Sequence, residues 1–169
     1  MVGVVADTGP LNYLILIDEI DLLPRLFGSV AIPEAVCEEL LDPRAPISVR
    51  AWMTSPPPWL RVAAGSLDSV PALATLDTGE RAAIDLAIGL SAGLLVMDDR
   101  AGVAAARSLG FRATGTPGVL DLGARLGWIN FHDAVTRLMA TNFRVSPALL
   151  DDLVARHRLS VRDAPETGG

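Results

Sequence analysis

The sequence predicts an α/β domain in which a central, mainly parallel sheet is covered by helices on both faces. Short apolar runs suited to buried strands alternate along the chain with stretches of helical periodicity, which is the order of βαβ units. The composition is that of a folded domain, because half of the 169 residues are apolar and only 20% are charged. We therefore expect a three-layer α/β/α domain with one core.

The first half of the chain supplies three of the expected strands. They are predicted at residues 2–6, 29–32 and 59–63. The helices between them are predicted at residues 11–27, with a break near Asp18, from Pro33 onward, and at residues 46–53. Pro33 suits the first turn of a helix, where the N–H that proline lacks would have no partner.

The second half begins with a helix opened by Asp77 and continues with two more strands. The strands are predicted at residues 94–97 and 111–114. The helices are predicted from residue 78 to about 91, and at residues 101–109, 117–126, 131–140 and 147–158. Gly110 ends the second of these helices and Ser146 is the expected N-cap of the last. We assign residues 1–158 to one domain and expect a disordered tail at residues 159–169.

Acidic residues follow two of the predicted strands. Asp7 ends the first strand, and Asp98 and Asp99 end the strand at residues 94–97. Because ligands of parallel α/β sheets bind at the carboxyl ends of strands, these acids are expected at one edge. Each also has a structural explanation, since Asp7 can form an Asx turn and the Asp98-Asp99 pair can cap the helix that follows.

Two helical glutamates are expected to face the same region. At about 100° per residue, Glu80 lies on the side of apolar residues three, four and seven positions later. Its alternative role is a capping box with Asp77. In the earlier helix, Glu39 lies close to the apolar stripe of Val36 and Leu40, whereas Glu38 is nearly opposite to it. Glu39 is therefore the better site candidate of the pair.

Several carboxylates at one edge repel one another, and burial raises their pKa values unless a cation is bound. Oxygen ligands without cysteine or histidine suit Mg²⁺ or Mn²⁺, whose coordination is completed by water and phosphate oxygens. The chemistry that such a site supports is attack of activated water on a phosphodiester.

Five short motifs carry a family resemblance that extends to about residue 155. They are DTGPL at residues 7–11, VCEEL at 36–40, LDTGERAAI at 76–84, LVMDDR at 95–100 and TGTPGVL at 114–120. Together they resemble a PIN-domain protein, most closely the VapC-toxin-like subgroup with GE-x-x-AI and DD motifs. The resemblance implies a metal-dependent endoribonuclease that cleaves RNA, with tRNA as a candidate substrate, and that is the toxin of a VapBC-type toxin–antitoxin pair. It also implies a cognate antitoxin protein and a homodimer as partners.

Carried over by position, the resemblance assigns catalytic roles to Asp7, Glu39, Glu80, Asp98 and Asp99. Asp7, Glu80, Asp98 and Asp99 are its metal ligands for Mg²⁺ or Mn²⁺, and either aspartate of the pair can supply the fourth acid. Thr8 is expected to orient Asp7 by a hydrogen bond. Val103 departs from the family, whose members tend to carry arginine there, so Arg100 and Arg107 become the candidates for a phosphate contact.

Other features narrow the function classes. The net charge of −6 argues against a broadly basic nucleic-acid surface but leaves room for a local basic patch. The chain has no lysine, which a phosphorylated receiver domain needs, and no G-x-G-x-x-G follows the first strand. Gly9 stands where a dehalogenase-type phosphatase needs a second acid. The serious alternative is a PIN-like module that binds RNA or protein without cleaving.

The chain also carries signs of its compartment. Cys37 is the only cysteine, so no intrachain disulfide can form, and a reducing cytoplasm suits the protein. We expect no membrane segment. His132 and His157 are distant in sequence from the acids, and we expect surface roles for both.

Overall fold

Within the described residues, 3–65 and 70–162 of this computed structural model, five parallel strands form one sheet in the order β3-β2-β1-β4-β5. The strands are β1 (Val4–Ala6), β2 (Val30–Pro33), β3 (Leu60–Ala63), β4 (Leu94–Val96) and β5 (Arg112–Thr114). From β1, the strands β2 and β3 are added in sequence on one side of the sheet, whereas β4 and β5 are added on the other side of β1. The predicted fold class is confirmed, and the strand order reverses between β1 and β4.

The helices lie where periodicity predicted them, with small shifts at their ends. They are α1 (Thr8–Leu16), α2 (Leu22–Phe27), α3 (Glu34–Leu41), α4 (Ile47–Thr54), the 3-10 turn η1 (Pro71–Leu73), α5 (Thr78–Gly89), α6 (Arg100–Ser108), α7 (Thr116–Arg125), α8 (Phe131–Met139) and α9 (Pro147–Arg162). The break near Asp18 is confirmed, and Asp18 itself has a positive φ of 62°. The first helix begins at Thr8 instead of residue 11, because Pro10 fits within its first turn.

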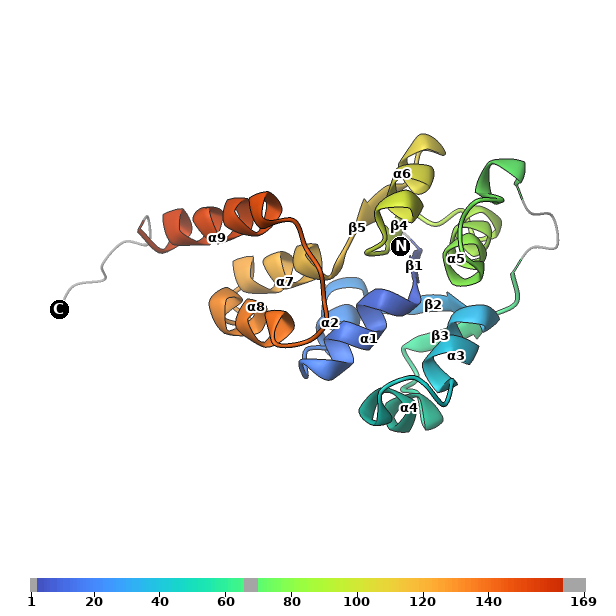
Figure 1. Cartoon of the computed structure of the whole chain (residues 1–169), viewed down its shortest axis with the longest axis horizontal. Coiled ribbons are helices and arrows are strands. Elements are labelled where there is room, and N and C mark those ends of the chain that lie inside the picture. Colours follow the sequence, from blue (N-terminus) through green and yellow to red (C-terminus); the bar gives the residue numbers. More distant parts are fainter. Residues whose placement is uncertain (1–2, 66–69, 163–169) are drawn as a thin grey trace.

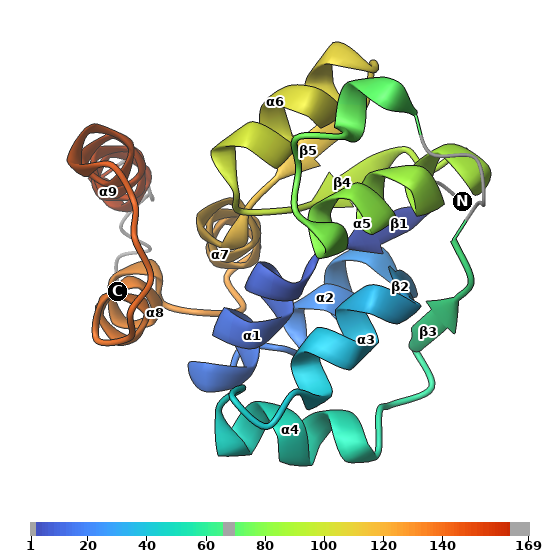
Figure 2. The same cartoon turned by 45° about the vertical axis from the view of Figure 1, so that its right-hand side comes forward.

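The expectation of one core is wrong, because the sheet divides the apolar interior and alternate strand residues face two separate clusters. Val4 and Ala6 of β1 face a large cluster with α1, α2, α3, α4, α7 and α8, whereas Val5 faces a smaller one with η1, α5 and α6. Figure 1 and Figure 2 show these helices on opposite sides of the sheet. The alternation follows from the two-residue period of a strand and makes the sheet the middle of three layers.

The last helix stands apart from the sheet, beside α8 (Figure 1). Its N-cap is Ser146 as predicted, since Ser146 Oγ accepts a hydrogen bond from the backbone N–H of Leu149 at 3.2 Å. The helix continues to Arg162, four residues beyond the end expected for the domain. Residues 163–169 of the expected tail lie outside the described residues. No helix in the described parts is both long and apolar enough to cross a membrane.

Candidate active site at the carboxyl edge of the sheet

The carboxyl ends of β1, β4 and β5 are tied together by hydrogen bonds between their backbones. The N–H of Asp7 donates to the carbonyl of Val96 at 2.9 Å, and the N–H of Met97 donates to the carbonyl of Thr114 at 2.8 Å. The residues that follow these strands are therefore held at neighbouring positions. The structure brings Asp7 and Asp98 together at the point where the strand order reverses, which is where α/β folds bind ligands.

Asp7 is buried, with only 7% of its surface exposed. Burial raises the pKa of its carboxyl group to about 7, and the nearby carboxylates of Asp77, Glu39 and Asp98 contribute to this rise. The backbone amide of Thr8 opposes this rise by stabilising the charged form. Asp7 is thus an acid that is repelled by three other carboxylates.

Glu39 reaches the same site from α3. Its Oε2 accepts a hydrogen bond from the hydroxyl of Thr8, whereas Glu38 is exposed. A Cβ added at Gly79 would lie 2.6 Å from Glu39 Oε1, so the glycine lets the start of α5 approach this carboxylate closely. The expected role of Thr8 needs correction in detail. Its contact with Asp7 is through the backbone amide, because its hydroxyl is bonded to Glu39.

Glu80 forms the expected capping box and is also buried near other carboxylates. It closes a capping box, since Asp77 Oδ1 accepts from the N–H of Glu80 at 2.8 Å and Glu80 Oε2 accepts from the N–H of Asp77 at 3.4 Å. Glu80 is also buried, with 8% exposed. Burial raises its pKa to about 7, and the carboxylates of Asp77, Asp99 and Asp7 contribute to the rise. Asp85 of the same helix is buried as well, although its angle on the helix places it away from the apolar residues beside Glu80.

The paired aspartates have different surroundings. Asp98 accepts two hydrogen bonds from Thr116, one from its N–H to Oδ1 and one from its hydroxyl to Oδ2, both at 2.6 Å. Burial raises the pKa of Asp98, and these bonds limit the rise. Asp99 is exposed and caps α6 by accepting from the N–H of Gly102 at 3.0 Å. The Asp98 carboxylate therefore interacts with Asp7, whereas the Asp99 carboxylate interacts with Glu80.

Two residues were not assigned to this site from the sequence. Asp77 adds a sixth carboxylate that interacts with both Asp7 and Glu80. Its signal was present, because the same Asp-x-x-Glu spacing that predicts a capping box also brings two acids to one helix end. Thr116, fully buried, holds Asp98 in place. It lies in the TGTPGVL motif, but its contact across 18 residues depends on the tertiary fold.

No arginine neutralises these acids in the part of the chain that the structure describes, because the salt bridges found there involve other carboxylates. A donor set made of carboxylate oxygens fits Mg²⁺ or Mn²⁺ in chemical type, and the raised pKa of Asp7 shows that the cluster favours an added positive charge. Within residues 3–65 and 70–162, no three His, Cys, Asp or Glu side chains are already grouped to hold a metal ion. The fit is therefore one of donor type and charge.

Comparison with known proteins identifies the family to which the chain belongs. A family model described as a PIN domain matches residues 3–158. The chain belongs to the PIN-domain family. The match covers every element from β1 through most of α9, and thus all the acids described above. PIN domains are generally nucleases, which typically use divalent metal ions. A search of curated proteins finds no match to this PIN-domain chain.

Proposed function

We propose that this PIN-domain protein is an endoribonuclease that depends on Mg²⁺ or Mn²⁺, and that it is the toxin of a VapBC-type toxin–antitoxin pair. The observation that carries the nuclease proposal is the convergence of acids from several elements at the edge where the strand order reverses. These acids are Asp7, Glu39, Glu80, Asp98 and Asp99. Their mutual repulsion, together with the burial of Asp7 and Glu80, is costly to stability unless a cation is bound.

When bound, a divalent metal supplies an activated water and stabilises the leaving oxygen of a phosphodiester. The side chains supply its ligands and their placement. Asp7, Glu80, Asp98 and Asp99 hold the metal on this proposal, Thr116 fixes Asp98, and Thr8 joins Glu39 to the start of α1. Because the pKa values of Asp7 and Glu80 are raised to about 7, metal binding displaces protons from these carboxyl groups and strengthens as the pH rises.

The partners of this proposal are RNA, an antitoxin protein and a second copy of the chain, with the cytoplasm as their place of action. A dimer surface in the first half of the chain is supported by two exposed apolar side chains. Leu41 at the end of α3 is 44% exposed and Ile47 at the start of α4 is 78% exposed. Light scattering on the purified protein tests the dimer, and a small neighbouring reading frame with a DNA-binding motif supports the toxin assignment.

The nuclease proposal is tested by comparing the wild type with Asp7→Asn. Asparagine keeps the shape of the side chain and its Asx turn but removes the charge that a cation needs. Both proteins are incubated with single-stranded RNA and with tRNA in Mg²⁺ or Mn²⁺, and both are expressed in a host without antitoxin. We expect the wild type to cleave RNA and to be toxic, and Asp7→Asn to remain folded while losing metal binding, cleavage and toxicity together.

Two results contradict the proposal. Equal cleavage by both proteins points to a contaminating nuclease or to another active site. Cleavage by neither protein, with metal still bound by the wild type, favours the alternative of a PIN-like module that binds RNA or protein without cleaving it.

A further inference from the structure

A pocket of about 580 Å³ lies directly beside the acid site. Asp98 forms part of both, so the two are continuous. One wall of the pocket is α6, a second is the turn from β5 into α7, and the third is the segment from Phe143 to Leu153 that leads into α9. The pocket therefore lies between elements that are distant in the sequence.

The charged side chains that line this pocket are mostly basic. In the described part of the chain, Arg100, Arg107 and Arg144 line the pocket, and Asp98 is the acid among its lining residues. Arg100 and Arg107 are seven residues apart and share one face of α6, and Arg144 comes from the segment before α9. All three are exposed, and no ion pair is found for them among the described residues. In a chain of net charge −6, this is a local concentration of free positive charge.

The same pocket has an apolar side. Val103 and Ala104 lie between the two arginines of α6, and Leu149, which is 47% exposed, faces them from α9. Phe143 is also part of the wall and is fixed by an edge-to-face contact with Tyr13, with the ring centroids 4.8 Å apart. Cations beside apolar surface are the combination that binds unpaired nucleotides, because phosphates meet the charges and an exposed base meets the apolar wall.

We propose that this pocket binds a nucleotide that flanks the cleavage site in single-stranded RNA. Arg107 and Arg144 contact its phosphates, Arg100 directly follows the Asp98-Asp99 pair in the chain, and the base lies against Val103, Ala104 and Leu149. The proposal rests on the nuclease function proposed above for the adjoining acids. It also explains how a protein with an acidic surface overall can hold a polyanion.

The test measures binding and leaves cleavage aside. Asp7→Asn is the parent protein, and its affinity for a fluorescent short oligouridylate is measured by anisotropy over a salt series without divalent metal. Arg107→Gln/Arg144→Gln should bind more weakly. The slope of log affinity against log salt should also become shallower by about 0.7 for each phosphate that is no longer neutralised, or about 1.4 for the pair. Arg107→Lys/Arg144→Lys keeps the charge and should restore the parental slope.

The matched control is Arg61→Gln/Arg112→Gln, which removes the same charge from exposed strand residues outside the pocket. It should retain the parental slope. The proposal is overturned if the pocket variant keeps the parental affinity and slope, or if the control variant is weakened as much. It is also overturned if an RNA duplex or polyglutamate competes as well as oligouridylate, since neither offers an unpaired base.

The outcomes separate the two proposals. If the wild type cleaves RNA with Mn²⁺ but binding does not depend on Arg107 and Arg144, the pocket proposal fails and the nuclease stands. If binding depends on these arginines but the wild type never cleaves, the nuclease proposal fails and the pocket is a site of RNA binding.

Discussion

The hydroxyl of Thr8 distinguishes the two adjacent glutamates of α3, because it contacts only one of them. It donates to Glu39, which lies beside the start of α5, while Glu38 is exposed on the other side of the helix. Side chains one residue apart on a helix point about 100° away from each other, so only one of them can reach the acid site. The choice between the two carboxylates is therefore made by helix geometry and confirmed by a contact from α1.

This contrast gives a prediction with its own control. Glu39→Gln should lower metal-dependent RNA cleavage by about 10- to 100-fold, the usual effect of altering a group that supports metal ligands. Glu38→Gln should change it little, because exposed side chains outside the site contribute little. Initial rates of oligonucleotide cleavage at several Mn²⁺ concentrations measure both effects. Equal rates for Glu39→Gln and wild type, with a decrease in Glu38→Gln, would mean that α3 presents its other face to the substrate.

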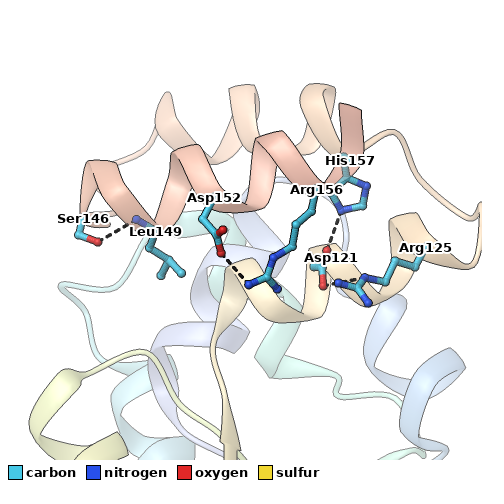
Figure 3. A network of polar contacts seen from close by, with 7 residues as sticks. All are labelled: Asp121, Arg125, Ser146, Leu149, Asp152, Arg156 and His157. Carbon is cyan, nitrogen blue, oxygen red and sulfur yellow. Dashed lines mark hydrogen bonds and ion pairs between the residues drawn. The ribbon is translucent and has the colours of Figure 1, made fainter. Parts of the chain in front are cut away.

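At the scale of the element, α9 is anchored by one buried polar group. Figure 3 shows Asp121 of α7 between His157 and Arg125. His157 Nε2 is hydrogen-bonded to Asp121 Oδ1 at 2.7 Å. The imidazole ring also stacks on the ring of Phe131, with the two ring centroids 4.0 Å apart. Arg125 Nε pairs with the second oxygen of Asp121 at 3.1 Å. The surface role expected for His157 is wrong, because α9 folds back over α7 and α8, and Asp121 and Phe131 of those helices cover most of the His157 side chain, which is 12% exposed.

Removal of this anchor should loosen α9. His157→Ala removes the stacking and the hydrogen bond and leaves Asp121 Oδ1 without that partner, at a cost of about 1–3 kcal/mol. Hydrogen exchange should show reduced protection in α9, with less change in the sheet. His132→Ala is the control, because His132 is exposed, and it should alter stability by less than about 0.5 kcal/mol. Unchanged protection of α9 in His157→Ala would show that apolar contacts such as those of Leu153 hold the helix without the histidine.

At the scale of the whole molecule, the acid site works against folding when metal is absent. The native state raises the pKa of Asp7 from 3.8 to about 7 and that of Glu80 from 4.5 to about 7. Between these limits the native protein binds more protons than the unfolded chain, so the free energy of unfolding falls as the pH rises. Each proton held only by the native state contributes about 1.4 kcal/mol per pH unit to that fall.

Thermal unfolding in EDTA should therefore give a melting temperature that decreases from pH 4 toward pH 7, across the interval that these pKa values define. Added Mn²⁺ should reverse the decrease at the upper end, because a ligand that binds only the native state raises its stability, by about 2.7 kcal/mol at a hundred times its dissociation constant. Asp7→Asn should flatten the dependence and respond little to Mn²⁺. A melting temperature that is independent of pH in EDTA, or unaffected by Mn²⁺ in the wild type, would contradict the site as described.

The sequence by itself determined the layers of the fold and predicted which acids lie at the carboxyl edge of the sheet. The two-residue and 3.6-residue periods mark strands and helix faces locally, and acids that directly follow apolar strands are carried to the carboxyl edge of any parallel sheet. For this reason Asp7, Glu80 and the Asp98-Asp99 pair could be predicted without knowing the strand order.

Only the tertiary structure decided which groups meet across long stretches of chain. Thr8 and Glu39 are 31 residues apart, and Asp121 and His157 are 36 apart. No local pattern encodes these pairs, because they depend on how α1 packs on α3 and how α9 returns over α7. The same reason applies to Arg144, which joins Arg100 and Arg107 only because the segment before α9 passes beside α6. Local periodicity fixes an element and its faces, but the partner of each face is chosen by the packing of the whole chain.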